Sequence, residues 1–246
     1  MGKHNVPPPD KLAYYLLKSV NKAIRDHAMI ADGDRVAVAV SGGKDSLTLL
    51  RLLQLRQQSV LEKHVLLAVH VQMTGSGGVA CHAADTRGNL ESYLEQLGQE
   101  YVVETVDLPD GSTCFRCSYL RRKALFMAAR RLGCNKVALG HHADDAAETT
   151  LMNLLFHGRV ETLYPKRSFF SGKFDLIRPM IYVPEKDIVR FARAAALPMA
   201  ASSCPISAGS RRTLVKGWIR AMDREYPRVK INLFRAGLRG EPEGEQ

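Results

Sequence analysis

A buried strand that runs directly into a glycine-rich turn and then a helix is the feature that most constrains the fold. Residues 35–40 read Arg-Val-Ala-Val-Ala-Val and are followed at once by Ser41-Gly-Gly-Lys-Asp-Ser46. Leucines then recur at helical spacing over residues 47–53. The two glycines let backbone N–H groups turn inward, and such a nest at a helix N-terminus binds anions. The sequence therefore predicts a phosphate-binding loop, to which Lys44 adds positive charge.

This loop is not a Walker A motif, which requires G-x-x-x-x-G-K-[ST]. Val38 occupies the position of the first glycine, and Asp45 follows the lysine where Ser or Thr is required. An ordinary strand-to-helix turn is the structural alternative. The hexapeptide resembles the PP-loop of the ATP-pyrophosphatase superfamily. That resemblance implies that the loop holds the β- and γ-phosphates of ATP, which is cleaved to AMP and pyrophosphate.

Predicted strands and helices alternate along the chain. Buried strands are expected at 35–40, 65–71, 101–106 and 136–140, and helices at 10–31, directly after the loop, at 85–98 and at about 117–132. A further helix from residue 142, an extended piece at 174–178 and a helix at 184–196 follow. This rhythm predicts an α/β fold with a doubly wound parallel sheet, in which ligands bind at the carboxyl ends of the strands.

Three parts of the chain are expected. They are an N-terminal helical segment (residues 1–34), a PP-loop ATP-pyrophosphatase domain (35–200) and a basic C-terminal segment with a disordered tail (201–246).

A second polar segment follows the fourth predicted strand and reads Gly140-His-His-Ala-Asp-Asp-Ala-Ala-Glu-Thr149. Asp144 and Glu148 are four residues apart, so on a helix they share a face that suits a hard cation. A capping box with Asp145 as N-cap and Glu148 three residues later is the structural alternative. Zinc at the paired histidines and aspartates is disfavoured, because zinc prefers Cys and His ligands. Beside a phosphate loop the segment favours Mg²⁺, which screens the leaving pyrophosphate.

The five cysteines are an odd number in a chain whose N-terminus lacks the apolar core of a signal peptide. This favours reduced thiols or metal ligands over disulfides. Cys114 and Cys117 form a C-x-x-C at the start of a predicted helix, and Cys204 lies far downstream. A thioredoxin-like pair would follow the first strand of its fold, and structural zinc would need four ligands. Three thiolates with one open position suit a [4Fe–4S] cluster, while Cys81 and Cys134 are expected to be ordinary thiols.

The order of these motifs resembles the tRNA 2-thiocytidine synthetase group, the iron–sulfur-dependent tRNA thiolases of the PP-loop superfamily. The resemblance covers roughly residues 10–210. It rests on the C-x-x-C pair followed by Leu120-Arg-Arg122, then Gly140-His-His, Ile177-Arg-Pro179, Glu185-Lys-Asp-Ile188 and a late cysteine. One departure is Ser203-Cys-Pro-Ile-Ser207, a single cysteine where the family often has Cys-x-x-Cys-Gly.

The resemblance implies that ATP adenylates a pyrimidine carbonyl of tRNA and that sulfur replaces the oxygen, with ATP, Mg²⁺ and a [4Fe–4S] cluster as cofactors. Catalytic roles are expected for Lys44, Asp45 and Asp144. Lys44 would stabilise the pyrophosphate and Asp45 would position Mg²⁺ or water, or simply place a charge at the helix start. The expected nucleotide-binding residues are Ser41, Gly42, Gly43, Lys44, Asp45, Ser46, Gly140 and Asp145. The expected cluster ligands are Cys114, Cys117 and Cys204.

The chain is strongly basic, with a formal net charge of +10 from 35 Lys and Arg against 25 Asp and Glu. This favours a polyanionic partner, nucleic acid first and a membrane surface second. Arginines and lysines at 212, 216, 220 and 224 would line one side of a C-terminal helix, which suits tRNA phosphates, although a solvated helix face is the alternative. A second basic patch near the cysteine pair comprises Arg116, Arg121, Arg122, Lys123, Arg130 and Arg131.

The expected setting is a cytoplasmic enzyme with no membrane partner, which takes sulfur from a cysteine desulfurase or free sulfide and for which a homodimer is allowed. Two other functions stay open. One is a PP-loop ligase or amidating enzyme with a zinc or vestigial cysteine site. The other is a non-catalytic nucleotide-binding regulator whose cysteines sense redox state.

Overall fold

The computed structural model describes residues 8–74, 84–199 and 211–239, without the side chains of residues 84–87 and 114. The strands are β1 (Arg35–Ala39), β2 (Val65–Thr74), β3 (Tyr101–Asp107), β4 (Lys136–Ala138), β5 (Lys166–Phe169) and β6 (Phe174–Ile177). The helices are α1 (Pro9–Asp26), α2 (Lys44–Gln57), α3 (Ala84–Gln96), α4 (Cys114–Arg131), α5 (Ala143–His157), α6 (Glu185–Ala194), α7 (Arg211–Glu225) and α8 (Val229–Arg239).

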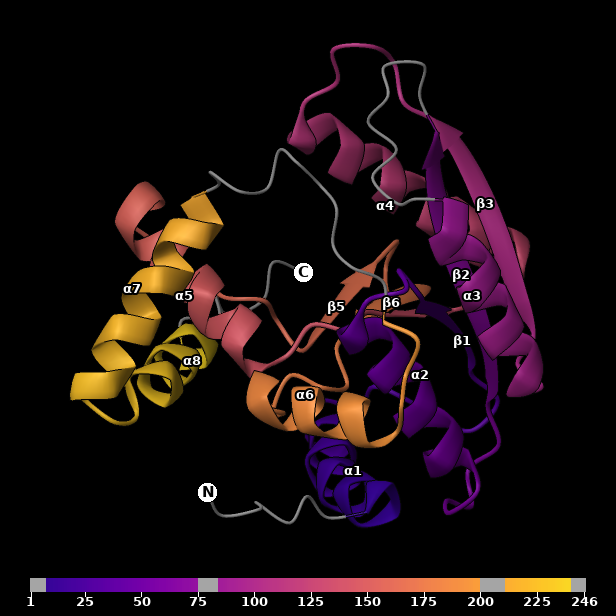
Figure 1. The fold of residues 1–246 in the computed structure, drawn as a ribbon, viewed down its shortest axis with the longest axis horizontal. Coiled ribbons are helices and arrows are strands. Elements are labelled where there is room, and N and C mark those ends of the chain that lie inside the picture. The colour runs from indigo at the N-terminus through magenta and orange to yellow at the C-terminus, as the bar shows by residue number, and fades with distance from the viewer. Residues whose placement is uncertain (1–7, 75–83, 200–210, 240–246) are drawn as a thin grey trace.

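The six strands form one sheet in the order β3-β2-β1-β4-β6-β5. Every neighbouring pair is parallel except β5 and β6. The predicted α/β fold with a parallel sheet is therefore confirmed (Figure 1). Strand β5 was not predicted, because its sequence Lys-Arg-Ser-Phe is polar and lies half exposed at the sheet edge.

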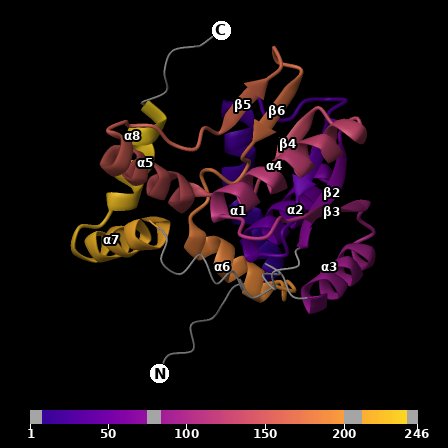
Figure 2. The same cartoon turned by 90° about the horizontal axis from the view of Figure 1, so that it is seen from above.

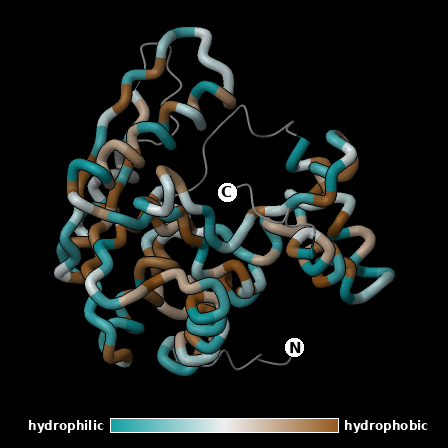
Figure 3. The backbone as a smooth tube through the Cα atoms, turned by 180° about the vertical axis from the view of Figure 1, so that it is seen from behind, coloured by the Kyte–Doolittle hydropathy of each residue, from teal (hydrophilic) through white to brown (hydrophobic). Residues whose placement is uncertain are grey.

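Two apolar cores lie on the two faces of this sheet, because successive strand residues point to opposite sides. Val36 and Val38 of β1 pack with α1, α2, α3 and α6, whereas Ala37 packs with α4 on the other face. Figure 2 shows the sheet between these helices, and Figure 3 shows hydrophobic segments running through this part of the molecule. Leucines 47, 49, 50, 52 and 53, predicted as the apolar face of the loop helix, are all fully buried.

Helices α7 and α8 form a hairpin (residues 211–239, the α7–α8 hairpin) that lies beside α5 (Figure 1). Leu151 of α5 packs with Val215 and Ile219 of α7 in a small buried cluster. On the α8 side the approach is closer, since a Cβ at Gly237 would lie 2.2 Å from Thr150 Oγ1 and 2.6 Å from Thr162 Cβ. The hairpin therefore packs directly against the helix that begins at the end of β4.

None of the described helices is long and apolar enough to span a membrane.

Candidate functional site

Four connections meet at one edge of the sheet. Strands β1, β3, β4 and β6 run parallel to one another through the sheet, so the segments that follow them leave at the same edge. These segments are the phosphate loop after β1, the start of α4 after β3, the start of α5 after β4 and the start of α6 after β6. The topology thus gathers the predicted phosphate loop, the C-x-x-C segment and the Gly140 segment at one end of the fold.

The phosphate loop is held by its own serines. Ser46 Oγ accepts a hydrogen bond from the Ser41 N–H at 3.1 Å and donates one to the Gly43 carbonyl at 3.0 Å. Gly42 has a φ of +81°, a conformation that favours glycine and explains this residue in the turn. Gly43 is the N-cap of α2, so the positive end of the helix faces the loop. The strand, the glycine turn and the helix start that were predicted for this loop are therefore present.

Gly140 packs directly on the backbone of this loop. A Cβ at position 140 would lie 3.0 Å from both the Asp45 carbonyl carbon and the Ser46 nitrogen. Backbone atoms cannot move aside as a flexible side chain can, so a side chain here would displace the loop. The end of β4 therefore sets the position of the phosphate loop, which places Gly140 in the site as predicted but in a packing role.

The start of α5 has a capping box, but the residues that form it differ from the structural alternative with Asp145 as N-cap. The N-cap is His142, not Asp145: the Asp145 N–H donates to His142 Nδ1 at 3.4 Å, and the His142 N–H donates to Asp145 Oδ2 at 3.0 Å. Asp145 is thus the third helical residue. A capping box is present, but a buried histidine and not aspartate supplies the N-cap acceptor.

His141 is uncharged at neutral pH. Burial, and then the neighbouring Arg178 guanidinium, lower the pKa of His141 to about 4. Arg178 Nε donates to His141 Nδ1 at 3.3 Å, so the ring proton is on Nε2.

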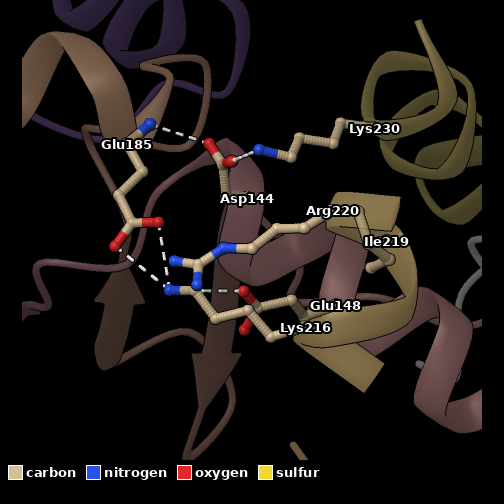
Figure 4. Close-up of a pocket in the computed structure, with 7 residues that line it drawn as sticks. All are labelled: Asp144, Glu148, Glu185, Lys216, Ile219, Arg220 and Lys230. Carbon is tan, nitrogen blue, oxygen red and sulfur yellow. Dashed lines mark hydrogen bonds and ion pairs between the residues drawn. The ribbon is translucent and has the colours of Figure 1, made fainter. Parts of the chain in front are cut away.

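Four carboxylates gather beside the phosphate loop, and we call them the carboxylate cluster: Asp144, Asp145 and Glu148 of α5, and Glu185 of α6. Figure 4 shows three of them around a small pocket that is also lined by Lys216, Ile219, Arg220 and Lys230 of the α7–α8 hairpin. The Glu185 N–H donates to Asp144 Oδ2 at 2.7 Å, which joins the starts of α5 and α6.

Side-chain cations of the hairpin neutralise this cluster. Lys230 Nζ lies 2.8 Å from Asp144 Oδ1. Arg212 bridges Asp145 at 2.5 Å and Glu148 at 2.9 Å. Lys216 Nζ lies 3.0 Å from Glu185 Oε2 and 3.6 Å from Glu148 Oε1. The cluster is therefore a set of ion pairs, and the described residues contain no group of three His, Cys, Asp or Glu side chains placed to hold a metal ion.

These ion pairs keep the carboxylates ionised. Burial alone would raise the pKa of Glu185, but hydrogen bonding and charge from Lys216 and Lys44 lower it to about 2. Burial likewise opposes the hydrogen bonds from the Glu185 N–H and Lys230 that lower the pKa of Asp144. Burial would lower the pKa of Lys44, but Asp45 and Glu185 raise it above its ordinary value. Both acids and the loop lysine are therefore charged at neutral pH.

Lys44 is paired rather than free in the loop. Its Nζ lies 2.9 Å from Asp45 Oδ2 and 3.2 Å from Glu185 Oε1. Incoming phosphate oxygens must therefore take over donors that two carboxylates now occupy. No site role was predicted for Glu185 from the sequence, although this residue belongs to the Glu185-Lys-Asp-Ile188 motif.

The predicted C-x-x-C pair lies at the start of α4. Helix α4 begins at Cys114, three residues earlier than predicted, because Thr113 Oγ1 caps it by accepting from the Arg116 N–H at 3.3 Å. Cys114 and Cys117 therefore lie in the first turn, three residues apart and on one helical face. Cys117 is a free, half-buried thiol whose sulfur accepts from Arg121 Nη2 at 3.8 Å.

The other predicted cysteines divide between described and undescribed parts of the chain. Cys204 and Cys81 lie outside the described residues, so the proposed third ligand is not placed. Cys134 is buried, as predicted, and burial raises the pKa of its thiol, which makes it unreactive.

The predicted basic stripe on α7 has two parts. Arg212 and Lys216 pair with the carboxylate cluster, and Arg220 lines the same pocket, while Arg224 lies on the exposed surface. The second patch, along α4, is also split: Arg116 and Arg122 lie near its start, but Arg130 and Arg131 lie in its last turn, where Arg131 pairs with Glu104.

Comparisons with known proteins agree with these features. A model of the PP-loop domain matches residues 13–204. The chain is 38% identical over 239 residues to the tRNA-cytidine(32) 2-sulfurtransferase of Geobacter sulfurreducens, covering 92% of this chain and 90% of that protein. It is 34% identical over 232 residues to the protein of the same name from Geotalea uraniireducens, covering 92% of each. Its fold matches the U34-tRNA thiolase NcsA from Methanococcus maripaludis, solved with its [4Fe-4S] cluster, with a TM-score of 0.78 and 24% identity over 97% of this chain and 82% of that one.

Proposed function

Because this chain belongs to the PP-loop domain family, together with the tRNA-cytidine(32) 2-sulfurtransferases, we propose that it is an ATP-dependent tRNA sulfurtransferase that thiolates cytidine 32. One observation carries the proposal. The phosphate loop and the C-x-x-C turn of α4 follow parallel strands and leave the sheet at the same edge. Thiolation of a base needs that arrangement, because the carbon activated by ATP must be the one that receives sulfur.

The residues of the chain supply the first half of the reaction. The cytidine C2 oxygen attacks the α-phosphorus of ATP, forming a base–O–AMP bond and releasing pyrophosphate. Backbone amides of the phosphate loop and the Lys44 ammonium stabilise the negative charge that develops on the pyrophosphate. Gly140 packs on the loop backbone, so the backbone amides are positioned before ATP binds.

Mg²⁺ fits this site through very few protein ligands. It usually binds substrate phosphates together with one or two carboxylates, and Asp45 beside the loop is the candidate. The carboxylate cluster is engaged by hairpin cations and does not form a cation cage among the described residues. The expected catalytic role of Asp144 is therefore better described as holding α6 and Lys230 in place.

A [4Fe–4S] cluster fits the donor chemistry of the cysteine side. Two thiols share the first turn of α4, and Cys117 is free, with an Arg121 N–H directed at its sulfur. Cys114, Cys117 and Cys204 would hold the cluster. When bound, it supplies an iron that can carry the sulfur to be transferred. In the second half of the reaction the C2–S bond forms as the C2–O bond breaks, and AMP leaves with that oxygen.

The test is a reconstituted assay. Protein loaded with iron and sulfide under anaerobic conditions is mixed with ATP, sulfide and a tRNA carrying C32 or, as control, U32. Pyrophosphate and 2-thiocytidine are both expected only with C32, detected by phosphate assay and nucleoside mass spectrometry. Pyrophosphate without thiolation would favour the ligase alternative. No pyrophosphate with any RNA would favour the regulator.

A further inference from the structure

Two lysines from distant parts of the chain share one carboxylate oxygen. Lys44 Nζ of the phosphate loop lies 3.2 Å from Glu185 Oε1. Lys216 Nζ of α7 donates to the same oxygen at 3.1 Å and lies 3.0 Å from Oε2. Both ammonium groups therefore lie within ion-pair distance of the same Glu185 oxygen. Figure 4 shows the Lys216–Glu185 contact.

Packing, and not only charge, brings Lys216 to this place. Its neighbours on α7, Val215 and Ile219, are almost completely buried against α5. Gly237 lets α8 approach Thr150 of α5 closely, which fixes the other side of the hairpin. Lys216 itself keeps 31% of its side chain exposed, so a ligand can reach its ammonium group. Packing of the hairpin therefore holds Lys216 at the edge of the site.

A phosphate group can replace a carboxylate at this position. Both present anionic oxygens to an ammonium, and an ammonium has three donors that rotate freely. The 3.6 Å separation between Lys216 Nζ and Glu148 Oε1 is longer than a hydrogen bond. Glu148 therefore competes only weakly with a phosphate group for the Lys216 ammonium.

We propose that Lys216 is a second phosphate-binding residue of the ATP site, supplied by the α7–α8 hairpin. On ATP binding its ammonium moves from Glu185 to a phosphate oxygen, next to that of Lys44. The inference rests on the proposed ATP-dependent function. It assigns the C-terminal hairpin a part in nucleotide binding, in addition to any contact with RNA.

The experiment compares nucleotide binding by full-length variants without RNA, using ATP, inorganic pyrophosphate and adenosine as probes in calorimetry. Lys216→Gln is expected to weaken ATP and pyrophosphate binding about tenfold, the lower limit for a lost charge-assisted hydrogen bond. Adenosine binding should not change, because adenosine carries no phosphate. Lys216→Arg should retain most of the affinity. Lys186→Gln, an exposed lysine one residue from Glu185, is the matched control and should bind as wild type.

The outcomes separate the inference from the proposed function. Equal loss of ATP and adenosine binding, or no loss at all, would overturn the role of Lys216. A wild-type protein that binds neither ATP nor pyrophosphate would overturn the proposed function instead. Lys216→Met keeps the apolar stem of the side chain and serves as the test variant if glutamine lowers the melting temperature.

Discussion

Helices α4 and α5 begin at the same edge of the sheet, yet their first turns are built in opposite ways. The start of α5 is tied by a capping box, by ion pairs to α7 and α8, and by Gly140 packed on the phosphate loop. The start of α4 has a threonine cap, no acidic residue in its first turn, and an exposed Phe115. The nucleotide side is thus organised by the protein itself. Among the described residues, the start of α4 has no ion pair to another element comparable to those of α5.

The largest expected effect is on the cysteine side. Cys117→Ser should abolish both cluster binding and thiolation, because serine is a poor ligand for iron, while the melting temperature of the sheet domain changes little. Cys114→Ser and Cys204→Ser should behave in the same way. Iron content, absorbance near about 400 nm and 2-thiocytidine are the measurements.

Cys134→Ala and Cys81→Ser are the controls for that experiment and should keep cluster and thiolation, with some loss of stability at buried Cys134. Full thiolation by Cys204→Ser would exclude the three-cysteine cluster and leave an ATP-pyrophosphatase of unknown substrate.

On the nucleotide side, Lys44→Ala should lower ATP turnover by at least an order of magnitude, as expected for lost charge-assisted phosphate bonds of about 1.5–3 kcal/mol. Iron content should stay unchanged, which distinguishes a loss of ATP turnover from a loss of the cluster. Lys173→Ala, an exposed lysine between β5 and β6, is the charge-matched control. Normal turnover by a folded Lys44→Ala protein would show that the nucleotide binds elsewhere.

A glycine pair tests whether packing holds the hairpin against α5. Gly237→Ala places a methyl group on Thr150 and Thr162 and should lower the free energy of unfolding by about 1–3 kcal/mol. Gly217→Ala on α7 meets nothing within 4 Å and should raise it by about 0.5–1 kcal/mol through helix propensity. Urea unfolding measures both. The same sign for the two variants would contradict the packing argument.

The two parts of the α7 stripe give a smaller effect, on RNA affinity. Reversing exposed Arg220 and Arg224 to glutamate should weaken binding about equally across tRNA sequences. The slope of log affinity against log salt should fall by about 1 per lost phosphate contact. Arg224→Glu alone should leave ATP binding without RNA unchanged, whereas Arg220 lines the pocket beside Lys216. Unchanged RNA affinity in both charge-reversal variants would show that this face is an ordinary solvated surface.

The smallest effect is on pH dependence. Because the pKa of Glu185 is lowered to about 2, its ion pairs stabilise the fold fully above its ordinary pKa of 4.5, and this contribution is lost as pH falls towards 2. Glu185→Gln should therefore flatten the fall in unfolding free energy between these pH values. Parallel pH curves for wild type and variant would show that Glu185 does not contribute.

The sequence predicted the parts of the fold whose signals are local. The run from Val36 to Ser46 carries apolar residues, two glycines and a leucine face, and each of these signals is read over neighbouring residues. Strand β5 escaped prediction because an exposed edge strand has no apolar run, and its pairing depends on β6.

The site was less predictable where its contacts join distant residues. Glu185 matters because it lies between Lys44 and Lys216, and no spacing in the sequence indicates that proximity. For the same reason Arg212 and Lys216 were expected to face RNA: their carboxylate partners come from α5 and α6. A stripe on one helix shows which residues share a side, but it does not show what that side meets.

Helix α5 connects the phosphate loop with the α7–α8 hairpin. Its 15 residues span about 22 Å. The capped end lies beside the phosphate loop, and the rest of the helix packs against the hairpin. A rotation of about 5° at the capped end would displace the far end by about 2 Å over that length. Because the hairpin packs on α5, such a rotation would also move the exposed arginines of α7.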